Sequence, residues 1–306
     1  MEPPGEASRG RPSTRFRGNY LFSEAFLYAV ATLALRRRVM FSAAHAYWFP
    51  ERSEEENRAL FGRWASRWGH GHNYVVELSV AGELDERTGM VVNITDVDQA
   101  LKRAIRPLRD KHLTYEVPYF AQNPPTTENI ARYVVAAFNR EFTDPAAHLT
   151  QVIVWETPTL WATWIKETDT MVALTRFLDF AASHRLHAPS LTDEENVTIF
   201  GKCNNRAGHG HNYGVEVTVI GEPNPITGMI VDLVSLDALL DREIMGTYDH
   251  KHLNEDTDDF KQTNPTSENL TLAIWRRLEN KIPAPAKLHR VVVRETERNY
   301  FEYDGK

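Results

Sequence analysis

The sequence predicts an α+β protein made of two tandem copies of one domain, each an antiparallel four-stranded sheet with two helices on one face. Three observations predict this architecture. The chain has 306 residues, a length that suits roughly two domains. Two histidine-containing motifs of its first half return in its second half, and in each half strand-like and helix-like patterns follow in the order strand, strand, helix, helix, strand, strand.

The repeat has an offset of 139 residues, the separation of His45 from His184 and of His70 from His209. Around these residues, Phe41-Ser-Ala-Ala-His45 matches Phe180-Ala-Ala-Ser-His184, and Gly69-His-Gly-His-Asn-Tyr74 matches Gly208-His-Gly-His-Asn-Tyr213. The offset becomes 140 at Lys111-His-Leu113, which matches Lys251-His-Leu253. A unit of this length is a duplicated domain, since solenoid repeats are far shorter.

We place the first domain at residues 36–165 and the second at 170–306, after a tail and leader segment at 1–35. Residues 1 to 19, rich in Gly, Pro, Ser and Arg, are expected to be a disordered tail. The most apolar stretch, Leu21 to Leu35, contains Glu24 and is shorter than the ~20 residues of a membrane span. No membrane partner and no secretion signal are therefore expected.

The second half illustrates the periodic patterns. Residues 215–220 alternate apolar and polar side chains, and residues 289–294 do so less strictly, as half-buried strands do. Residues between them form two apolar helical stripes: Leu236, Leu239, Leu240 and Ile244, then Leu270, Ile274 and Leu278. Capping-box spacing at 53–56 and at 192–195 predicts a short helix before the glycine at 62 and at 201.

Composition limits the classes of function. Asp and Glu outnumber Lys and Arg by 42 to 35, a net charge of −7, which argues against a general nucleic-acid partner. The single cysteine, Cys203, excludes an intrachain disulfide and a cysteine-rich zinc module, so metal ligands must be His, Asp or Glu. A reducing compartment is expected, and the protein is predicted to be cytoplasmic.

Three histidines in each half can converge on one metal ion. His184 leaves the first strand of the second half, and the period of two in the next strand points His209 and His211 to one face. Three neutral imidazoles with one open position form a catalytic zinc pattern. The first half repeats the trio as His45, His70 and His72, so Zn²⁺ is the predicted cofactor.

Other reactive side chains lie near the second trio. Cys203 lies six residues before His209, and its polar neighbours Lys202, Asn204 and Asn205 argue against a buried thiol. Lys202 together with a nearby metal would favour the thiolate. Asp249 precedes His250, and such a pair can orient or relay a proton. Glu295 ends an apolar strand, as Glu156 does in the first half, where a carboxylate could accept two donors from a guanidine-like edge.

These motifs carry a resemblance to a known family. The second half resembles the 6-pyruvoyltetrahydropterin synthase and 6-carboxytetrahydropterin synthase family over essentially its whole length, and is closest in pattern to the pyruvoyl branch. The matching segments, in order, are 180–186, 194–196, 200–205, 208–213, 227–229, 249–251, 266–269 and 295–296. So many motifs in the same order make the resemblance very specific. It implies tandem T-fold domains.

The resemblance also implies an activity and a set of roles. Family members convert 7,8-dihydroneopterin triphosphate to 6-pyruvoyltetrahydropterin and eliminate triphosphate, a carbon–oxygen lyase reaction. Zinc ligands would be His184, His209 and His211 in the second half, with His45, His70 and His72 in the first. The proton-transfer triad would be Cys203, Asp249 and His250, and the substrate would be bound by Glu295, Thr266 and, in the first half, Glu156.

The first half departs from the family pattern where chemistry would occur. Trp64 stands at the position of Cys203. The segment Arg109-Asp-Lys-His112 is one residue short against Asp249-His-Lys-His252, so Asp110 replaces either the aspartate or the histidine of the triad. This half is therefore expected to lack proton-transfer chemistry, although Trp64 could stack on a flat heterocycle.

Two alternatives to the leading function stay open. One is 6-carboxytetrahydropterin synthase of the queuosine pathway, whose members usually place the cysteine four residues before the His-x-His pair; the spacing of six here favours the pyruvoyl branch. The other is a non-catalytic pterin-binding protein, against which the intact set of Cys203, Asp249 and His250 argues. Lys202, Arg185 and Lys251 are candidate phosphate partners, and surface charge is the alternative for each.

Assembly is also implied by the resemblance, because T-folds join side by side into barrels and two barrels stack. Three chains with two T-folds each would rebuild a six-domain particle. We expect a homotrimer, or another homo-oligomer, with one ring of first halves stacked on one ring of second halves.

Overall fold

The computed structural model describes residues 32–168 and 170–306. The expected tail and most of the expected leader segment lie outside the described residues, whereas residues 32–35 are the start of the first strand. In the part of the chain that is described, no helix has the length and apolar character needed to cross a membrane.

The two halves contain corresponding elements in the same order. The first half consists of β1 (Thr32–His45), α1 (Glu54–Phe61), η1 (Gly62–Trp64), β2 (His70–Glu83), α2 (Ile94–Ile105), β3 (Lys111–His112), α3 (Leu113–Glu116), η2 (Pro118–Ala121), α4 (Thr127–Glu141), β4 (Ala147–Thr157), β5 (Leu160–Ile165) and η3 (Lys166–Thr168).

The second half consists of β6 (Val172–His184), α5 (Asp193–Phe200), η4 (Gly201–Asn204), β7 (His209–Gly221), α6 (Leu233–Leu240), η5 (Asp241–Met245), α7 (Gly246–Tyr248), β8 (Lys251–His252), α8 (Leu253–Asp256), η6 (Asp258–Phe260), α9 (Ser267–Leu278), β9 (Lys287–Thr296) and β10 (Asn299–Tyr303).

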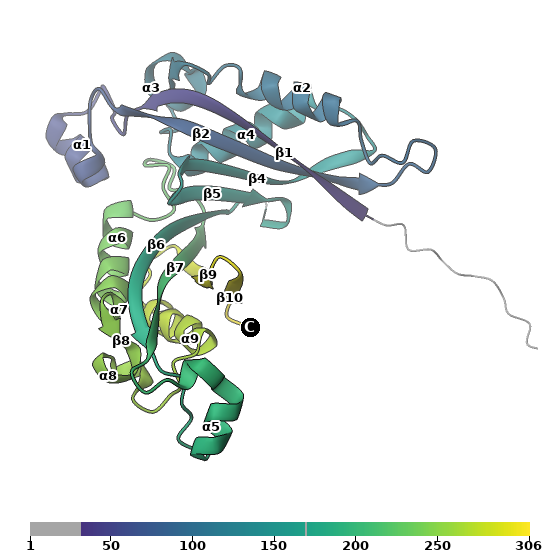
Figure 1. Ribbon diagram of the computed structural model, residues 1–306. Coiled ribbons are helices and arrows are strands. Elements are labelled where there is room, and N and C mark those ends of the chain that lie inside the picture. Colours follow the sequence, from purple (N-terminus) through teal and green to yellow (C-terminus); the bar gives the residue numbers. More distant parts are fainter. Residues whose placement is uncertain (1–31, 169) are drawn as a thin grey trace, which may run out of the picture. The chain divides into compact units, whose positions relative to one another are not determined.

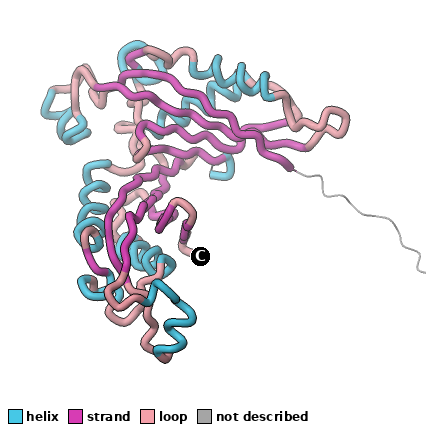
Figure 2. Tube along the Cα trace, in the orientation of Figure 1, coloured by secondary structure: helices cyan, strands magenta, loops and turns pink. Residues whose placement is uncertain are grey.

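Each half is an antiparallel four-stranded sheet with two helical segments against one face, as predicted (Figure 2). These segments are α2 and α4 in the first half, and α6–α7 and α9 in the second. The strand order is β10-β9-β7-β6-β5-β4-β2-β1-β3, and β8 pairs with β6. The two-residue strands β3 and β8 are parallel additions at equivalent places in the two halves. Both predicted capping boxes are present, on Ser53 and on Thr192, and the helices they begin end at Phe61 and Phe200.

The two halves join edge to edge within one sheet, because β5 pairs with β6 from Leu160 opposite Arg176 to Thr163 opposite Ala173 (Figure 1). Only η3 and a short turn connect these two strands. A connection this short brings the chain back along the adjacent strand. The expected arrangement, with first halves in one ring and second halves in another, is therefore wrong.

Side-chain contacts across this junction reinforce the strand pairing. The Thr126 hydroxyl donates to the Gly228 carbonyl at 2.8 Å, and the Ile230 amide donates to the Glu128 carboxylate at 3.1 Å. Asp237 of the second half pairs with Arg63 of the first at 3.2 Å. Buried apolar residues of both halves form one contiguous cluster.

A single-residue difference between the halves is taken up by a π-helical turn. The repeat offset grows from 139 to 140 between residues 229 and 251. The segment η5 lies in this interval and is π-helical, whereas the corresponding α2 is regular over its length. A π-turn holds more residues than an α-turn, so the extra residue is absorbed without disturbing the helix ends.

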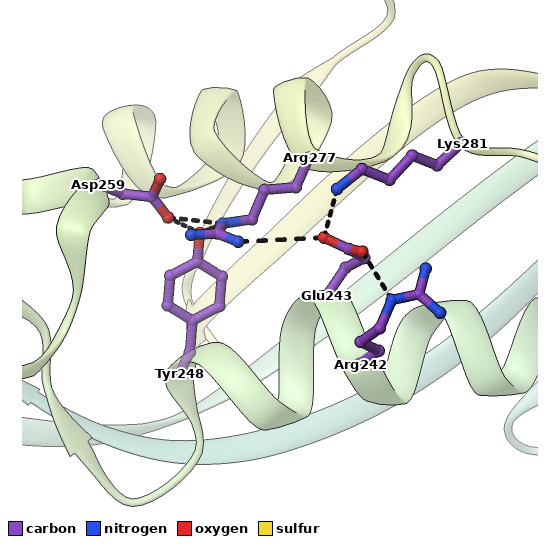
Figure 3. A network of polar contacts seen from close by, with 6 residues as sticks. All are labelled: Arg242, Glu243, Tyr248, Asp259, Arg277 and Lys281. Carbon is purple, nitrogen blue, oxygen red and sulfur yellow. Dashed lines mark hydrogen bonds and ion pairs between the residues drawn. The ribbon is translucent and has the colours of Figure 1, made fainter.

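A network of polar side chains binds η5 and α7 to α9 (Figure 3). Tyr248 donates to Asp259 at 2.6 Å, and Arg277 donates to the same carboxylate at 2.7 Å. Glu243 accepts from Lys281 at 2.6 Å and from Arg242 at 2.9 Å. The network fixes the end of α7, immediately before Asp249 and His250, relative to the helix that begins beside Glu295.

Glu243→Gln should lower the free energy of unfolding, because it removes the charge that this network surrounds. The Lys281 hydrogen bond, despite the opposing effect of desolvation, holds the pKa of Glu243 below its ordinary value of 4.5. A lowered folded-state pKa stabilises the protein above about pH 5 and the benefit is lost as the pH falls. Denaturant unfolding at pH 7 should show a loss of roughly 1.5–3 kcal/mol.

The loss should shrink between pH 5 and pH 3, where the wild-type carboxylate becomes protonated. Glu255→Gln is the matched control, because Glu255 is exposed. An equal loss at pH 3 and pH 7 would contradict the electrostatic origin of the effect.

Candidate functional site

Strand register brings the three histidines of the second half together. His184, the last residue of β6, lies opposite His209, the first residue of β7, and His211 follows on the same face. The Nε2 atoms of His184 and His209 are 3.1 Å apart. Gly208 has φ +73°, and a Cβ there would lie 2.9 Å from the His184 carbonyl oxygen, so this close turn requires glycine.

The histidine nitrogens fit a metal ion. His184 Nδ1 lies 2.7 Å from the Pro265 carbonyl, an arrangement that puts the proton on Nδ1 and leaves Nε2 free as a ligand. His211 Nε2 is buried without a hydrogen-bond partner, as an unfilled ligand position would be. Burial lowers the pKa of His184 and of His209, which favours the neutral imidazole that metals bind. The three ligand atoms lie within 4.8 Å of one another.

Glu295 lies beside this cluster on β9. Its Oε1 accepts from the Ser267 hydroxyl at 2.8 Å, and its Oε2 accepts from the Asn299 amide at 3.1 Å. Burial alone would raise the pKa of Glu295, but these two hydrogen bonds, together with the charges of His211 and His184, outweigh it and the pKa is lowered. Thr266, the residue before Ser267, caps α9 through a hydrogen bond from the Asn269 amide. The predicted substrate residues therefore meet at the start of α9.

Cys203 lies in η4, half-buried, with its carbonyl accepting from the Leu186 amide at 2.9 Å. Tyr213 lies on β7 beside His184; burial raises the pKa of this phenol, and the charges of Glu295 and Cys203 raise it further. The backbone of Cys203 lies against the segment that follows His184.

Asp249 and His250 form a hydrogen-bonded pair, Oδ2 to Nδ1 at 2.9 Å. Asp249 Oδ1 also accepts from the Ala181 amide at 3.1 Å, and the bond to His250 is the main cause of its lowered pKa. The imidazole is 82% exposed and, with His211, lines a pocket of about 480 Å³. Within the described residues, no hydrogen bond or ion pair joins this pair to Cys203.

The first half repeats the histidine cluster with one difference. The Nε2 atoms of His45 and His70 are 3.2 Å apart, and His45 Nδ1 lies 2.8 Å from the Pro125 carbonyl. Glu156, which sequence reasoning assigned to substrate binding, lies with them: its Oε1 is 3.5 Å from His72 Nε2. All four side chains offer ligand atoms within 4.8 Å of one another.

The remaining first-half positions show how this half diverged. Asp110 has φ +59° and donates its amide to Ser42 at 2.7 Å, as His250, with φ +56°, does to Ala181. Asp110 therefore replaces His250, and Arg109 replaces Asp249. Trp64 is half-buried against the cluster of Tyr47, Phe61 and Met229, with Arg63 over its ring at 4.8 Å. Stacking of this indole on a free ligand would have to displace these neighbours.

Sequence reasoning missed the partners of the two strand-end carboxylates. Thr127 donates to Glu156 at 2.7 Å, as Ser267 does to Glu295. The signal was present, because a hydroxyl residue follows the capping threonine in both halves. Sequence reasoning also missed Glu128, which is 3% exposed; burial raises its pKa to about 7. Its contact with Ile230 lies 102 residues away along the chain and leaves no local pattern.

The chain belongs to the 6-pyruvoyl tetrahydropterin synthase family, as a tandem duplication: the sequence model of that family matches residues 34–167 and again 173–306. A 6-pyruvoyl tetrahydrobiopterin synthase of Drosophila melanogaster is 44% identical over 132 residues, 43% of this chain and 79% of that protein. The human protein of the same name is also 44% identical, over 44% of this chain and 91% of its own length.

A solved structure of Caenorhabditis elegans 6-pyruvoyl tetrahydropterin synthase is 40% identical and covers 44% of this chain and 96% of its own chain, with a TM-score of 0.43. Each of these proteins thus spans a segment about as long as one half of this chain.

Metal analysis tests the two histidine clusters directly. The protein purified without chelators should hold two ions per chain, because the histidine ligand atoms converge in both clusters and a backbone carbonyl lies beside Nδ1 of His45 and of His184, which leaves Nε2 to face the ion. His45→Ala and His184→Ala should each remove one ion, measured by plasma mass spectrometry. His148→Ala, an exposed histidine of β4, should remove none. A chain that carries no ion after such a purification would rule out both sites.

Proposed function

We propose that the second half, residues 170–306, is a zinc-dependent lyase that converts 7,8-dihydroneopterin triphosphate to 6-pyruvoyltetrahydropterin with elimination of triphosphate. One observation carries the proposal. Only this half combines three converging imidazoles with a half-buried thiol and a hydrogen-bonded Asp–His pair. The names of the relatives support the pterin substrate.

His184, His209 and His211 would hold a zinc ion and leave one ligand position open. Zinc there would act as a Lewis acid and make the C–H bonds of the substrate side chain more acidic. The Pro265 carbonyl keeps His184 in the required tautomer.

Glu295 orients the pterin ring in this proposal. Its carboxylate is ionised at neutral pH, since its pKa is lowered, and two oxygens can accept the two N–H donors of the pyrimidine edge. Ser267 and Asn299 hold the carboxylate in place. A substrate N–H group could replace either hydrogen bond, and the carboxylate would still have a hydrogen-bond partner. Thr266 caps the start of α9 and thereby positions Ser267, which holds Glu295.

Cys203 and the Asp249–His250 pair handle protons. The thiolate of Cys203 removes a carbon-bound proton, and the electron pair released forms the double bond as triphosphate leaves. His250, oriented by Asp249, donates and accepts protons during the tautomerisations that follow. Because Cys203 must stay reduced to act as a base, we also propose a reducing compartment such as the cytoplasm.

The first half, residues 36–165, has no side chain for this proton transfer. Trp64 stands in place of the thiol, and Arg109 and Asp110 in place of the Asp–His pair. We propose that this half supports the fold and the assembly and does not turn over substrate.

Cys203→Ala should abolish product formation while metal content and fold stay intact, because it removes the base and touches no ligand. His250→Ala should lower turnover on the order of 10²-fold or more. Trp64→Ala should change turnover far less. The measurement is mass spectrometry of the pterin formed from dihydroneopterin triphosphate, which also distinguishes a carboxy product from a pyruvoyl product.

Similar losses from Cys203→Ala and Trp64→Ala would contradict the division of labour between the halves. Tight pterin binding without any product would favour the non-catalytic alternative.

We further propose that a second copy of the chain completes the substrate site of the second half. Within one chain, Gly228 and Ile230 cover Thr126 and Glu128 of the first half, which are 1% and 3% exposed. Their repeat counterparts, Thr266 and Glu268, are half-buried and exposed.

The repeat offset of 139 makes residues 89–91 the counterpart of residues 228–230, so residues 89–91 of a second copy would cover Thr266 and Glu268. It is open in one chain: Met90 is 46% exposed, whereas its counterpart Met229 is 6% exposed. Strand β10 and strand β1 are likewise the counterparts of the paired strands β5 and β6. Lys202 and Asp98 would then form the counterpart of the Arg63–Asp237 ion pair.

Copies joined in this way associate head to tail and can close into a ring. Each chain contributes two halves, so the number of halves in such a ring is even. A homotrimer would be one ring of six halves.

Mixing two inactive variants tests this assembly. Met90→Asp places a charge in the contact, so the variant should dissociate to a 35.1 kDa chain in light scattering and lose activity. Added Cys203→Ala chains, inactive by themselves, should restore activity, because their intact residues 89–91 can complete the sites of the other variant. A Met90→Asp variant that still forms the wild-type assembly would contradict the proposal. So would a mixture of the two variants that co-assembles and stays inactive.

A further inference from the structure

We propose that Glu156 is the fourth ligand of the metal ion in the first half, and that this ion is structural, held in a closed site. The second half, in contrast, keeps an open ligand position. The inference rests on the proposed function only in that the histidine clusters bind zinc. It assigns Glu156 to the metal instead of to a substrate.

The distances in the first half fit four ligands on one ion. Bonds of 2.0–2.2 Å at tetrahedral angles put ligand atoms roughly 3.4 Å apart. His45 and His70 offer Nε2 atoms 3.2 Å apart, and Glu156 Oε1 is 3.5 Å from His72 Nε2. In the second half the corresponding separation, Glu295 Oε1 to His211 Nε2, is 3.9 Å, and the convergent group there consists of the three histidines alone.

The hydrogen bonds of the two carboxylates explain this difference. Both oxygens of Glu295 are occupied, Oε1 by Ser267 and Oε2 by Asn299. Asn299 has Leu160 as its counterpart in the first half, at the offset of 139 from residue 299 to residue 160, and leucine has no donor. Thr127 therefore holds only Oε2 of Glu156, and Oε1 is left with His72 as its neighbour.

The surroundings of Glu156 cover its carboxylate. Glu156 is 8% exposed, and the apolar cluster of Tyr47, Phe61 and Met229, with Trp64 packed against it, lies on this side of the first half. The ring of Tyr47 is 5.0 Å from that of His45. In the second half, the counterparts of Tyr47 and Phe61 are Leu186 and Phe200, both only half-buried.

A four-ligand ion in the first half would tie three strands together. His45 ends β1, His70 and His72 begin β2, and Glu156 lies at the end of β4. Structural zinc sites are four-coordinate with protein ligands only, whereas catalytic sites keep one position for water or substrate. The duplication has thus given one chain a site of each kind.

Metal release from the full-length zinc protein tests the inference. A coloured chelator in excess should remove the two ions in two phases, with the slower ion released on the order of 10- to 100-fold more slowly. Glu156→Gln should convert the slow phase to a fast one. Glu295→Gln, the matched change in the other half, should leave both phases as they are.

Leu160→Asn gives a second test that keeps every ligand. The new amide should engage the free oxygen of Glu156, as Asn299 does with Glu295, and speed release of the slow ion. Cobalt substitution in the His184→Ala background isolates the first site, whose absorption spectrum should be that of a four-coordinate ion and should not change when azide is added. Glu156→Gln should make this spectrum sensitive to azide.

Release of both ions in one phase, or a slow phase that survives Glu156→Gln in a folded variant, would overturn the inference while leaving the proposed activity untouched. Absence of metal from both halves would instead overturn the metal dependence in the proposed function. An azide-sensitive spectrum of the first site in the His184→Ala background would show that its fourth position is open.

Discussion

The register of the first two strands in each half is the constraint on which both sites depend. His45 lies opposite His70, and His184 opposite His209, at the ends of long antiparallel pairs that are uninterrupted along their length. Because side chains alternate between faces, a slip of one residue would turn the second and third histidines away from the first. The buried residues Tyr74 and Tyr213 follow two residues after His72 and His211. They stack on Phe41 and Phe180 of the paired strands, and this cross-strand contact resists such a slip.

The two halves show how one backbone can hold different chemistry. Asp110 and His250 share a left-handed backbone conformation, which Asp and His tolerate better than most residues, and both donate their amide to the neighbouring strand. The backbone demand of this turn therefore leaves the acid–base character of the side chain free to change. Leu160 in place of Asn299 is a similar exchange, since the strand position is kept and only the donor is lost.

Much of this could be predicted because it is local or repeated. The capping boxes on Ser53 and Thr192 and the α+β order follow from spacing and are confirmed. The predicted histidine trios converge in each half, and their role as zinc ligands stays a prediction. The pairing of β5 with β6 was missed because symmetry alone was considered, whereas the short connection from Ile165 to Val172 decides it. The place of Glu156 among the histidines depends on the absence of a donor at residue 160, which no motif records.

Fusion of the two halves gives the starts of α4 and α9 unequal surroundings, although the two halves are repeats of one domain. The segment that covers Thr126 and Glu128, residues 228–230, belongs to the same chain. Its effective concentration is therefore fixed by the covalent link, and it stays in place. A cover over Thr266 and Glu268 that comes from another copy has no such link, and its occupancy depends on association. In the proposed function, turnover belongs to the half whose cover comes from another copy, whereas the half that is covered within its own chain carries Trp64 at the position of the thiol and Glu156 beside its histidines.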